Sequence, residues 1–143
     1  MNTTGNALIV LGLEATTEEG VIKELIRALI GRPEVLDWQG LERAVLQRQQ
    51  LQPPLLENGV ALPHARTGTV SEMVMTIGRC AVPVPFGPEQ VPVRLVFLDG
   101  VPAHCIGEYL AAVARLVRPH KRPSTLAALL AAQDEAEVRR TLE

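Results

Sequence analysis

The stretch LLENGVALPHART, from Leu55 to Thr67, combines the pattern of a strand with a reactive side chain. Its apolar residues lead into Pro63 and His64, and His64 is one of only three histidines in the chain. Proline has no backbone N–H to continue a strand ladder, so the pattern predicts a short strand over residues 59–64 that ends here and leads into a loop. A histidine at such a strand end presents a ring nitrogen while the strand holds its backbone.

The chemistry of His64 has two interpretations when the residues are considered alone. An unperturbed imidazole is largely neutral near pH 7, so it can attack a phosphoryl group and form a phosphohistidine. Arg66 lies two residues further on and is a candidate cation for the negative charge of that product. The alternative is a histidine that only makes a hydrogen bond at the protein surface.

Two amphipathic helices are predicted before this stretch. The first lies within residues 15–33, with Thr16 or Thr17 as its N-cap and with Gly31 and Pro33 ending it. The second covers residues 37–51 and is expected to start from Asp37. Residues 52–59 then interrupt the regular pattern.

The remainder of the chain predicts strands and then helices again. Strands are expected at residues 73–81 and 91–100, and the near-continuous apolar run of the second suits a strand covered on both faces. A helix is expected over residues 104–119, and two short helices are expected to start at Ser124 and Asp134. This order predicts a single α/β domain over residues 1–143, with helices packed on a mixed sheet.

Composition excludes several classes of function. The formal net charge is −2, aromatic residues make up 3% of the chain, and no basic stretch dominates, so a nucleic-acid partner is not expected. No apolar run is long enough for membrane insertion, and the first residues lack the features of a secretory signal, which favours a cytoplasmic protein. Cys80 and Cys105 fit no metal or redox spacing and are expected to be thiols in a reducing compartment.

The segment ENGVALPHAR, residues 57–66, resembles the active-site segment of enzyme IIA domains of the mannitol/fructose and nitrogen-regulatory type. These domains belong to the bacterial phosphoenolpyruvate-dependent sugar phosphotransferase system. The pattern Gly, apolar, Ala, apolar, Pro, His and Gly or Ala is matched without a gap. Outside it the resemblance is weaker but covers nearly the whole chain: Arg48 matches an Arg-Glu pair in which Gln49 replaces the glutamate, and residues 93–103 look like the strand and turn that follow the motif.

The resemblance implies a fold, a reaction and a set of partners. The implied fold is a mixed sheet flanked by helices. His64 matches the histidine that is phosphorylated in the family. The resemblance therefore implies that His64 accepts phosphate from the phosphocarrier HPr or its nitrogen-branch counterpart. It also implies that His64 passes the phosphate to a cysteine of an enzyme IIB or that the phosphorylated residue acts as a regulatory signal. Arg48 and Arg66 are implied phosphate contacts, and neither a metal nor an organic cofactor is required.

Two departures from the family pattern concern the phosphate site. Where the family has a Gly-Ser-Thr-Gly loop, this chain has Gln52, Pro53, Pro54 and Leu55, so the hydroxyls and two amide donors are missing. Where the family has a second histidine, this chain has Ile106. His104, two residues earlier, either takes that role from a shifted position or is a polar turn residue.

The departures leave two functions open. The first is a phosphoryl carrier or phosphorylation-controlled regulator, and the second is a degenerate IIA-like regulatory module that is not phosphorylated. Glu57 and Asp99 either orient a histidine by accepting its N–H bond or are turn residues, and His120 lies in a basic connector. A metal-dependent hydrolase would need a cluster of ligands that the spacing of these residues does not supply.

Overall fold

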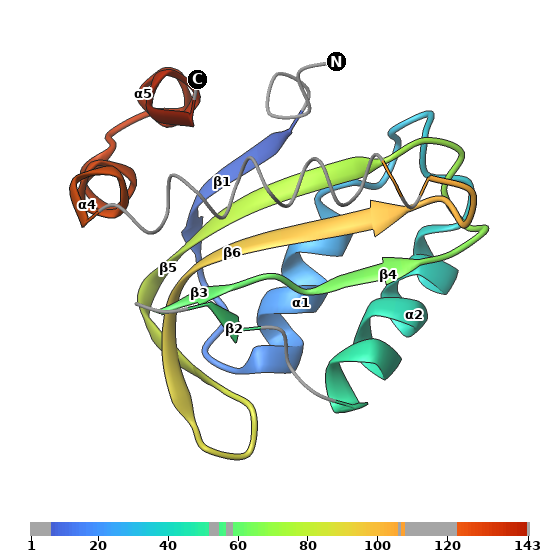
Figure 1. The fold of residues 1–143 in the computed structure, drawn as a ribbon, viewed down its shortest axis with the longest axis horizontal. Helices are drawn as coiled ribbons and strands as arrows, with labels where there is room; N and C mark the ends of the chain where they lie inside the picture. The colour runs from blue at the N-terminus through green and yellow to red at the C-terminus, as the bar shows by residue number, and fades with distance from the viewer. Residues whose placement is uncertain (1–6, 52–54, 57–58, 106, 108–122, 143) are drawn as a thin grey trace.

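The structure is a computed structural model, and it describes residues 7–51, 55–56, 59–105, 107 and 123–142. Ten elements follow one another along the described chain: β1 (Leu8–Leu13), α1 (Glu18–Arg27), α2 (Trp38–Leu51), β2 (Leu55–Leu56), β3 (Val60–Ala61), β4 (His64–Arg66), β5 (Val74–Phe86), β6 (Val91–Val101), α4 (Pro123–Ala131) and α5 (Glu135–Leu142). After the first strand, β1, two helices precede the remaining five strands, and α4 and α5 follow them (Figure 1).

The centre of the sheet is the long antiparallel pair β5 and β6. β1 pairs with β5 in parallel, and both β3 and β4 pair with β6 in parallel, while β2 is antiparallel to β3. The path β1-β5-β6-β3-β2, with β4 beside β6, makes a six-stranded mixed sheet. The predicted fold class, a mixed sheet flanked by helices, is therefore confirmed.

Local capping explains where the first two helices begin. The hydroxyl of Thr17 accepts a hydrogen bond from the backbone N–H of Gly20 at 3.0 Å, and Asp37 Oδ1 accepts one from Gly40 at 3.0 Å. Each side chain satisfies an N–H that the first helical turn leaves without a partner. Of the two predicted caps for α1, the structure selects Thr17, and it confirms Asp37 for α2.

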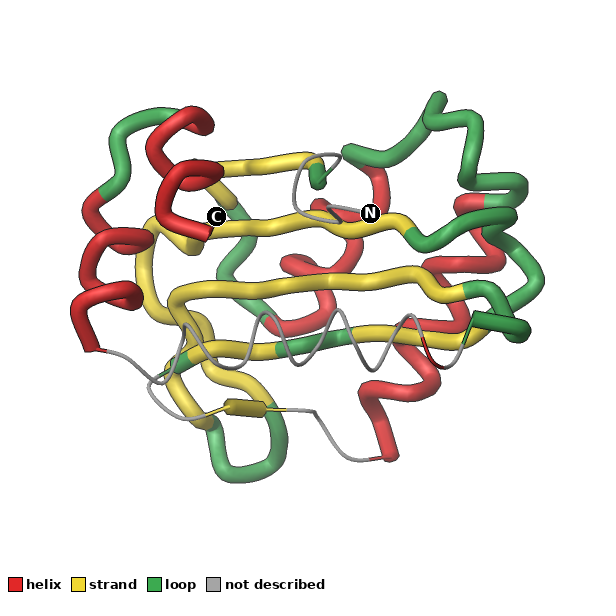
Figure 2. The backbone as a smooth tube through the Cα atoms, turned by 45° about the horizontal axis from the view of Figure 1, so that its top comes forward, coloured by secondary structure: helices red, strands yellow, loops and turns green. Residues whose placement is uncertain are grey.

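The sheet separates two apolar cores. α1 and α2 cover one face, where residues such as Leu25, Leu41 and Leu98 are fully buried. The opposite face packs Phe97 and its neighbours against apolar residues of α4 and α5, which include Leu129 and Val138. Figure 2 shows these two C-terminal helices together at one end of the sheet.

Arg79 of β5 fastens α4 to the sheet. Its guanidinium donates hydrogen bonds to the backbone carbonyls of Leu129, Leu130 and Ala132 at the end of that helix. These are carbonyls that have no partner within the helix, and a cation suits the negative end of the helix dipole. Asp134 then caps α5, as predicted, by accepting from the N–H of Glu137 at 2.9 Å.

Several predicted strands differ from the observed ones. β1 was not predicted, because six residues of a short apolar run carry no helical or alternating signature. β5 continues beyond residue 81 to Phe86, past a register shift between Arg79 and Val84. The predicted helix over residues 104–119, with Ile106, and the residues Gln52, Pro53, Pro54, Glu57 and His120 lie outside the described residues, apart from His104, Cys105 and Gly107.

The prediction that His64 ends a strand and begins a loop is wrong. Pro63 does interrupt the strand after β3, but His64 is the first residue of β4, which pairs with the far end of β6. The chain resumes pairing because only the N–H of Pro63 is missing; its carbonyl still accepts from the N–H of Asp99 at 3.0 Å.

Candidate functional site

The glycine of the motif sets up the strand that leads to His64. Gly59 has a φ of 78°, and a Cβ at this position would lie 3.0 Å from the carbonyl oxygen of Pro92. Its own carbonyl accepts from the N–H groups of Arg94 and Leu95, which starts the pairing with β6. Glycine is favoured here because it alone adopts this conformation without strain and without a clash.

The ring of His64 is held in one tautomer by its own backbone. Nδ1 lies 2.8 Å from the carbonyl oxygen of Leu62. A carbonyl can only accept a hydrogen bond, so Nδ1 is the protonated nitrogen, and in the neutral ring the lone pair is then on Nε2. The ring nitrogen that can act as a nucleophile is therefore Nε2.

The pKa of His64 is lowered from its ordinary value. Burial is the largest cause, and the positive charge of Arg48 acts in the same direction, while the hydrogen bond to the Leu62 carbonyl opposes both. The imidazole is therefore neutral at pH 7, which is the state a nucleophile requires.

The two arginines predicted at the site lie on different elements. Arg48 is half-buried in the last turn of α2, close enough to His64 to affect its pKa. Arg66 is exposed, two residues beyond His64 in β4, so both side chains project from the same face of that strand. Both positions suit cations that contact an anionic group on His64.

His104 occupies an exposed turn that follows β6. The turn runs from Pro102, whose carbonyl accepts from the N–H of Cys105 at 3.0 Å. The structure thus places the backbone of His104 in a turn. The suggested role of its side chain as a second histidine at the site stays a prediction. Cys105 and Cys80 are both buried thiols, and burial, with a smaller effect of Glu24, raises the pKa of Cys80 to about 11.

Asp99 lies next to His64, a neighbourhood that the sequence did not reveal. The reading of Asp99 as a turn residue is wrong, because it lies within β6, directly opposite His64 of β4 and Met75 of β5. Asp99 is 1% exposed, and within the described part of the chain no group hydrogen-bonds to its Oδ1. Burial raises the pKa of this carboxyl to about 8, so it is mostly protonated at pH 7.

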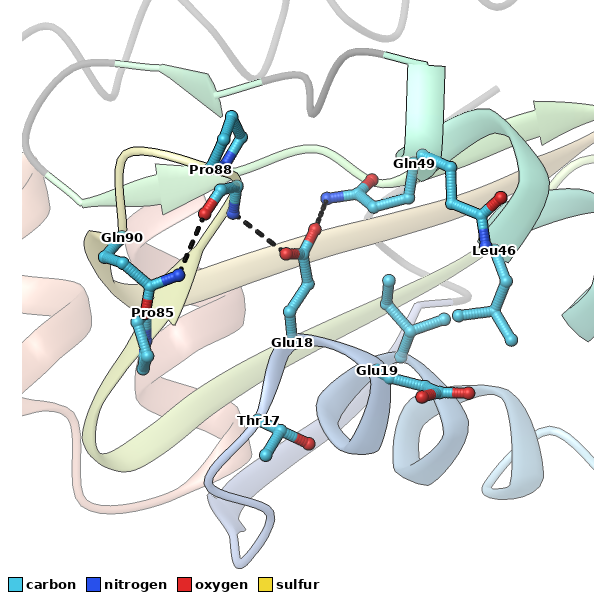
Figure 3. A pocket seen from close by; sticks show the side chains of 11 residues that line it. Thr17, Glu18, Glu19, Leu46, Gln49, Pro85, Pro88 and Gln90 are labelled. Carbon is cyan, nitrogen blue, oxygen red and sulfur yellow. Dashed lines mark hydrogen bonds between the residues drawn. The ribbon is translucent and has the colours of Figure 1, made fainter.

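A second polar cluster supports α2 from the side of α1 and lines a pocket of about 560 Å³ (Figure 3). The carboxylate of Glu18 accepts from the backbone N–H of Gly87 at 2.9 Å and from Nε2 of Gln49 at 2.8 Å. Three elements are thereby joined: the start of α1, the end of α2 and the loop between β5 and β6. Because Gln49 follows Arg48, this cluster also helps to fix the turn of α2 that carries the arginine.

Two classes of site find no support in the described part of the chain. It contains no group of three or more His, Cys, Asp or Glu side chains arranged to hold a metal ion. None of its helices has the length and apolar content needed to cross a bilayer.

The mixed sheet, its flanking helices and the Gly-to-His motif leading into β4 together define an enzyme IIA-type domain. The family model described as "Phosphoenolpyruvate-dependent sugar phosphotransferase system, EIIA 2" matches residues 3–143, and the chain belongs to this family.

Individual relatives agree with this assignment. The chain is 28% identical over 128 residues to the fructose-specific EIIABC component of Bacillus subtilis, a match that covers 89% of this chain and 20% of that protein. The chain thus spans about a fifth of that relative's length.

Solved structures give the same fold. Nitrogen regulatory protein IIA-Ntr of Neisseria meningitidis superposes with a TM-score of 0.86 at 29% identity, covering 94% of this chain and 92% of that one. The mannitol enzyme IIA of Escherichia coli, solved in complex with phosphorylated enzyme IIB, superposes with a TM-score of 0.81 at 23% identity, covering 94% and 92%. At that identity the second likeness concerns the fold alone.

Proposed function

We propose that this chain is a phosphoryl carrier, or a phosphorylation-controlled regulator, of the phosphotransferase system and accepts a phosphoryl group on Nε2 of His64. The observation that carries the proposal is the hydrogen bond from Nδ1 to the Leu62 carbonyl, together with the lowered pKa of the ring. These two features supply a neutral imidazole with its lone pair on Nε2.

The proposed step is an exchange between two histidines. The P–N bond of a phosphohistidine on an HPr-like donor breaks, and its electron pair stays on the donor nitrogen. The lone pair of Nε2 forms the new P–N bond. Nδ1 keeps its proton, so the phosphorylated ring carries a positive charge, which the Leu62 carbonyl stabilises by continuing to accept the hydrogen bond.

The cations near His64 support the developing negative charge. Arg48 and Arg66 are proposed to contact the phosphoryl oxygens, and a guanidinium presents several donors in a geometry that matches them. The onward acceptor is proposed to be a cysteine of an enzyme IIB, as the complex of the mannitol relative suggests, or a regulatory target. The proposal includes a cytoplasmic location.

The test is phosphorylation in a reconstituted system. The protein is incubated with phosphoenolpyruvate, enzyme I and HPr, and an acid-labile phosphoryl group is sought by intact mass. We expect one phosphoryl group on the wild-type chain and none on His64→Ala. His104→Ala tests in the same assay whether this second histidine is needed, and its exposed side chain can be removed without disturbing a core.

The outcome also separates the proposal from its alternative. The absence of hydroxyl side chains in residues 52–55 favours a regulatory module that binds partner proteins without being phosphorylated. No label on the wild-type chain, where a known enzyme IIA labels fully, would contradict the carrier and support the module. Label that persists on His64→Ala would instead contradict the choice of residue.

A further inference from the structure

Asp99 stands beside the proposed phosphoryl acceptor on the same face of the sheet. Its Cα is in register with that of His64 across the parallel pair β4 and β6. Directly opposed residues of neighbouring strands project to the same side, so the two side chains are neighbours. On the other flank of Asp99, the residue in register is Met75.

The surroundings of Asp99 make an ionised carboxylate unfavourable. Phe97, two residues earlier on the same face of β6, is 0% exposed, and Met75 is 4% exposed; both belong to the apolar core of this face. Burying a carboxyl among such groups stabilises its protonated form. Among the residues that the structure describes, Oδ1 nevertheless finds no hydrogen-bond partner, which is uncommon for a polar atom that is fully buried.

A phosphoryl group on His64 would bring a hydrogen-bond acceptor next to the buried carboxyl of Asp99. Its oxygens carry negative charge and need donors, and the four residues Gln52 to Leu55 offer no hydroxyl. A protonated carboxyl is a strong O–H donor, and it adds no negative charge next to the phosphate. An apolar residue at position 99 would leave the sheet intact but could not donate.

We propose that Asp99 is a phosphoryl-binding residue, whose carboxyl O–H donates a hydrogen bond to a phosphoryl oxygen once His64 is phosphorylated. This inference rests on the proposed function. No covalent bond changes at Asp99: the carboxyl keeps its proton and gains an acceptor. The phosphorylated state is thereby stabilised relative to the unmodified one.

The experiment measures the equilibrium of phosphoryl exchange between HPr and this chain. Phosphorylated HPr is mixed with the wild-type protein, Asp99→Asn, Asp99→Leu and Asp99→Ala, and the label on each protein is counted by intact mass. Asparagine keeps an N–H donor of similar shape, whereas leucine and alanine do not. Met75→Leu is the matched control, because it changes the other cross-strand neighbour without removing a donor.

We expect the amount of retained phosphate to fall only in the variants that have no hydrogen-bond donor at position 99. Asp99→Leu and Asp99→Ala are expected to shift the exchange equilibrium toward HPr by about tenfold or more, while Asp99→Asn and Met75→Leu stay within about threefold of wild type. Melting curves on the same samples distinguish this from damage to the fold. Replacing an unpartnered buried polar group by leucine is expected to raise the melting temperature, so stability and phosphate retention should move in opposite directions.

Two results would overturn the inference and are distinguishable. If the wild-type chain takes up phosphate and all Asp99 variants retain it equally, the role of Asp99 fails and the proposed function stands. If the wild-type chain takes up none, both fail together. Should Asp99→Leu not fold, the pair Asp99→Ala and Asp99→Asn gives the same decision.

Discussion

Two of the buried or half-buried acidic side chains, Glu18 and Asp99, have opposite surroundings. Glu18, at the start of α1, accepts one hydrogen bond on each carboxylate oxygen, one from the backbone N–H of Gly87 and one from the side-chain amide of Gln49. Asp99, near the end of β6, is more deeply buried, and its Oδ1 has no partner among the described residues. A carboxylate whose donors all come from the folded chain stabilises the fold, whereas an acid without such donors is available for a group that arrives later.

The largest effect on stability is expected for Glu18→Ala. This change leaves the N–H of Gly87 and the amide of Gln49 without their charged acceptor, and we expect a loss of about 2–3 kcal/mol in the free energy of unfolding. Denaturant melts at neutral pH measure it. Glu18→Gln keeps an acceptor and should lose less; equal losses would show that the size of the side chain, not its hydrogen bonds, is what matters.

A slightly smaller change in the free energy of unfolding is expected from the titration of Asp99. The ordinary pKa of the carboxyl is 3.8 and burial raises it to about 8, so between these values the folded state binds one proton more than the unfolded state. Stability then falls as pH rises through this range, with a limiting slope of about 1.4 kcal/mol per pH unit.

The range above pH 6.5 isolates this contribution. The lowered pKa of His64 makes stability rise with pH, a rise that levels off within about one pH unit above its ordinary value of 6.5, and Asp99→Asn shares this contribution. Between pH 6.5 and 8 the wild-type protein should therefore lose about 2 kcal/mol relative to Asp99→Asn, which does not titrate there. Parallel stability curves for the two proteins would show that Asp99 is ionised in the fold and would remove its contrast with Glu18.

The substitution Gln49→Glu replaces the hydrogen bond between Gln49 and Glu18 by repulsion between two carboxylates. It restores the glutamate that the family resemblance leads one to expect after Arg48, but it places a second carboxylate against Glu18, at the position from which Gln49 now donates. We expect a loss of about 1–2 kcal/mol at neutral pH, because like charges replace a hydrogen bond. The loss should shrink on acidification as the pair takes up a proton. A stability equal to wild type at pH 7 would show that the end of α2 moves to separate the charges.

The smallest effect is expected for Glu19→Gln, one residue from Glu18. Glu19 is exposed and forms an ion pair with Lys23 at 3.2 Å, one helical turn further on. Such exposed pairs contribute about 0.3–0.5 kcal/mol. Thermal melts at low and high salt measure this contribution, which should vanish at high salt. A loss as large as that of Glu18→Ala would contradict the view that burial and backbone partners distinguish the two glutamates.

The helical parts of the fold were predictable from short stretches of sequence. Thr17, Asp37 and Asp134 cap the helices predicted for them, because a cap is a contact over three residues. The start of α4 at Pro123 lies one residue before the predicted Ser124. The strands were less predictable: β1 is held by β5, more than sixty residues away, and β4 by the end of β6. No local pattern reports such partners.

The candidate site likewise contains residues that the sequence indicated and contacts that only the structure placed. His64, Arg48 and Arg66 were singled out because a contiguous motif and its flanking residues resemble a known family. The hydrogen bond of the His64 ring to the Leu62 carbonyl was not predicted, since it depends on the ring's orientation. Asp99 falls within the strand predicted over residues 91–100, but its place opposite His64 was missed, because the register between two strands leaves no local signal.

The sequence by itself indicated the family, His64 as the candidate nucleophile and the caps of three helices, since each depends on residues that are close together in the chain. Only the tertiary structure decided that His64 opens a strand, that Arg48 influences its pKa, and that Asp99 lies opposite it. The physical reason is that register and burial are properties of paired strands and packed helices. A carboxyl beside a glycine is a turn signal in the sequence, and it becomes a protonated acid next to a histidine only when β6 passes between β4 and β5.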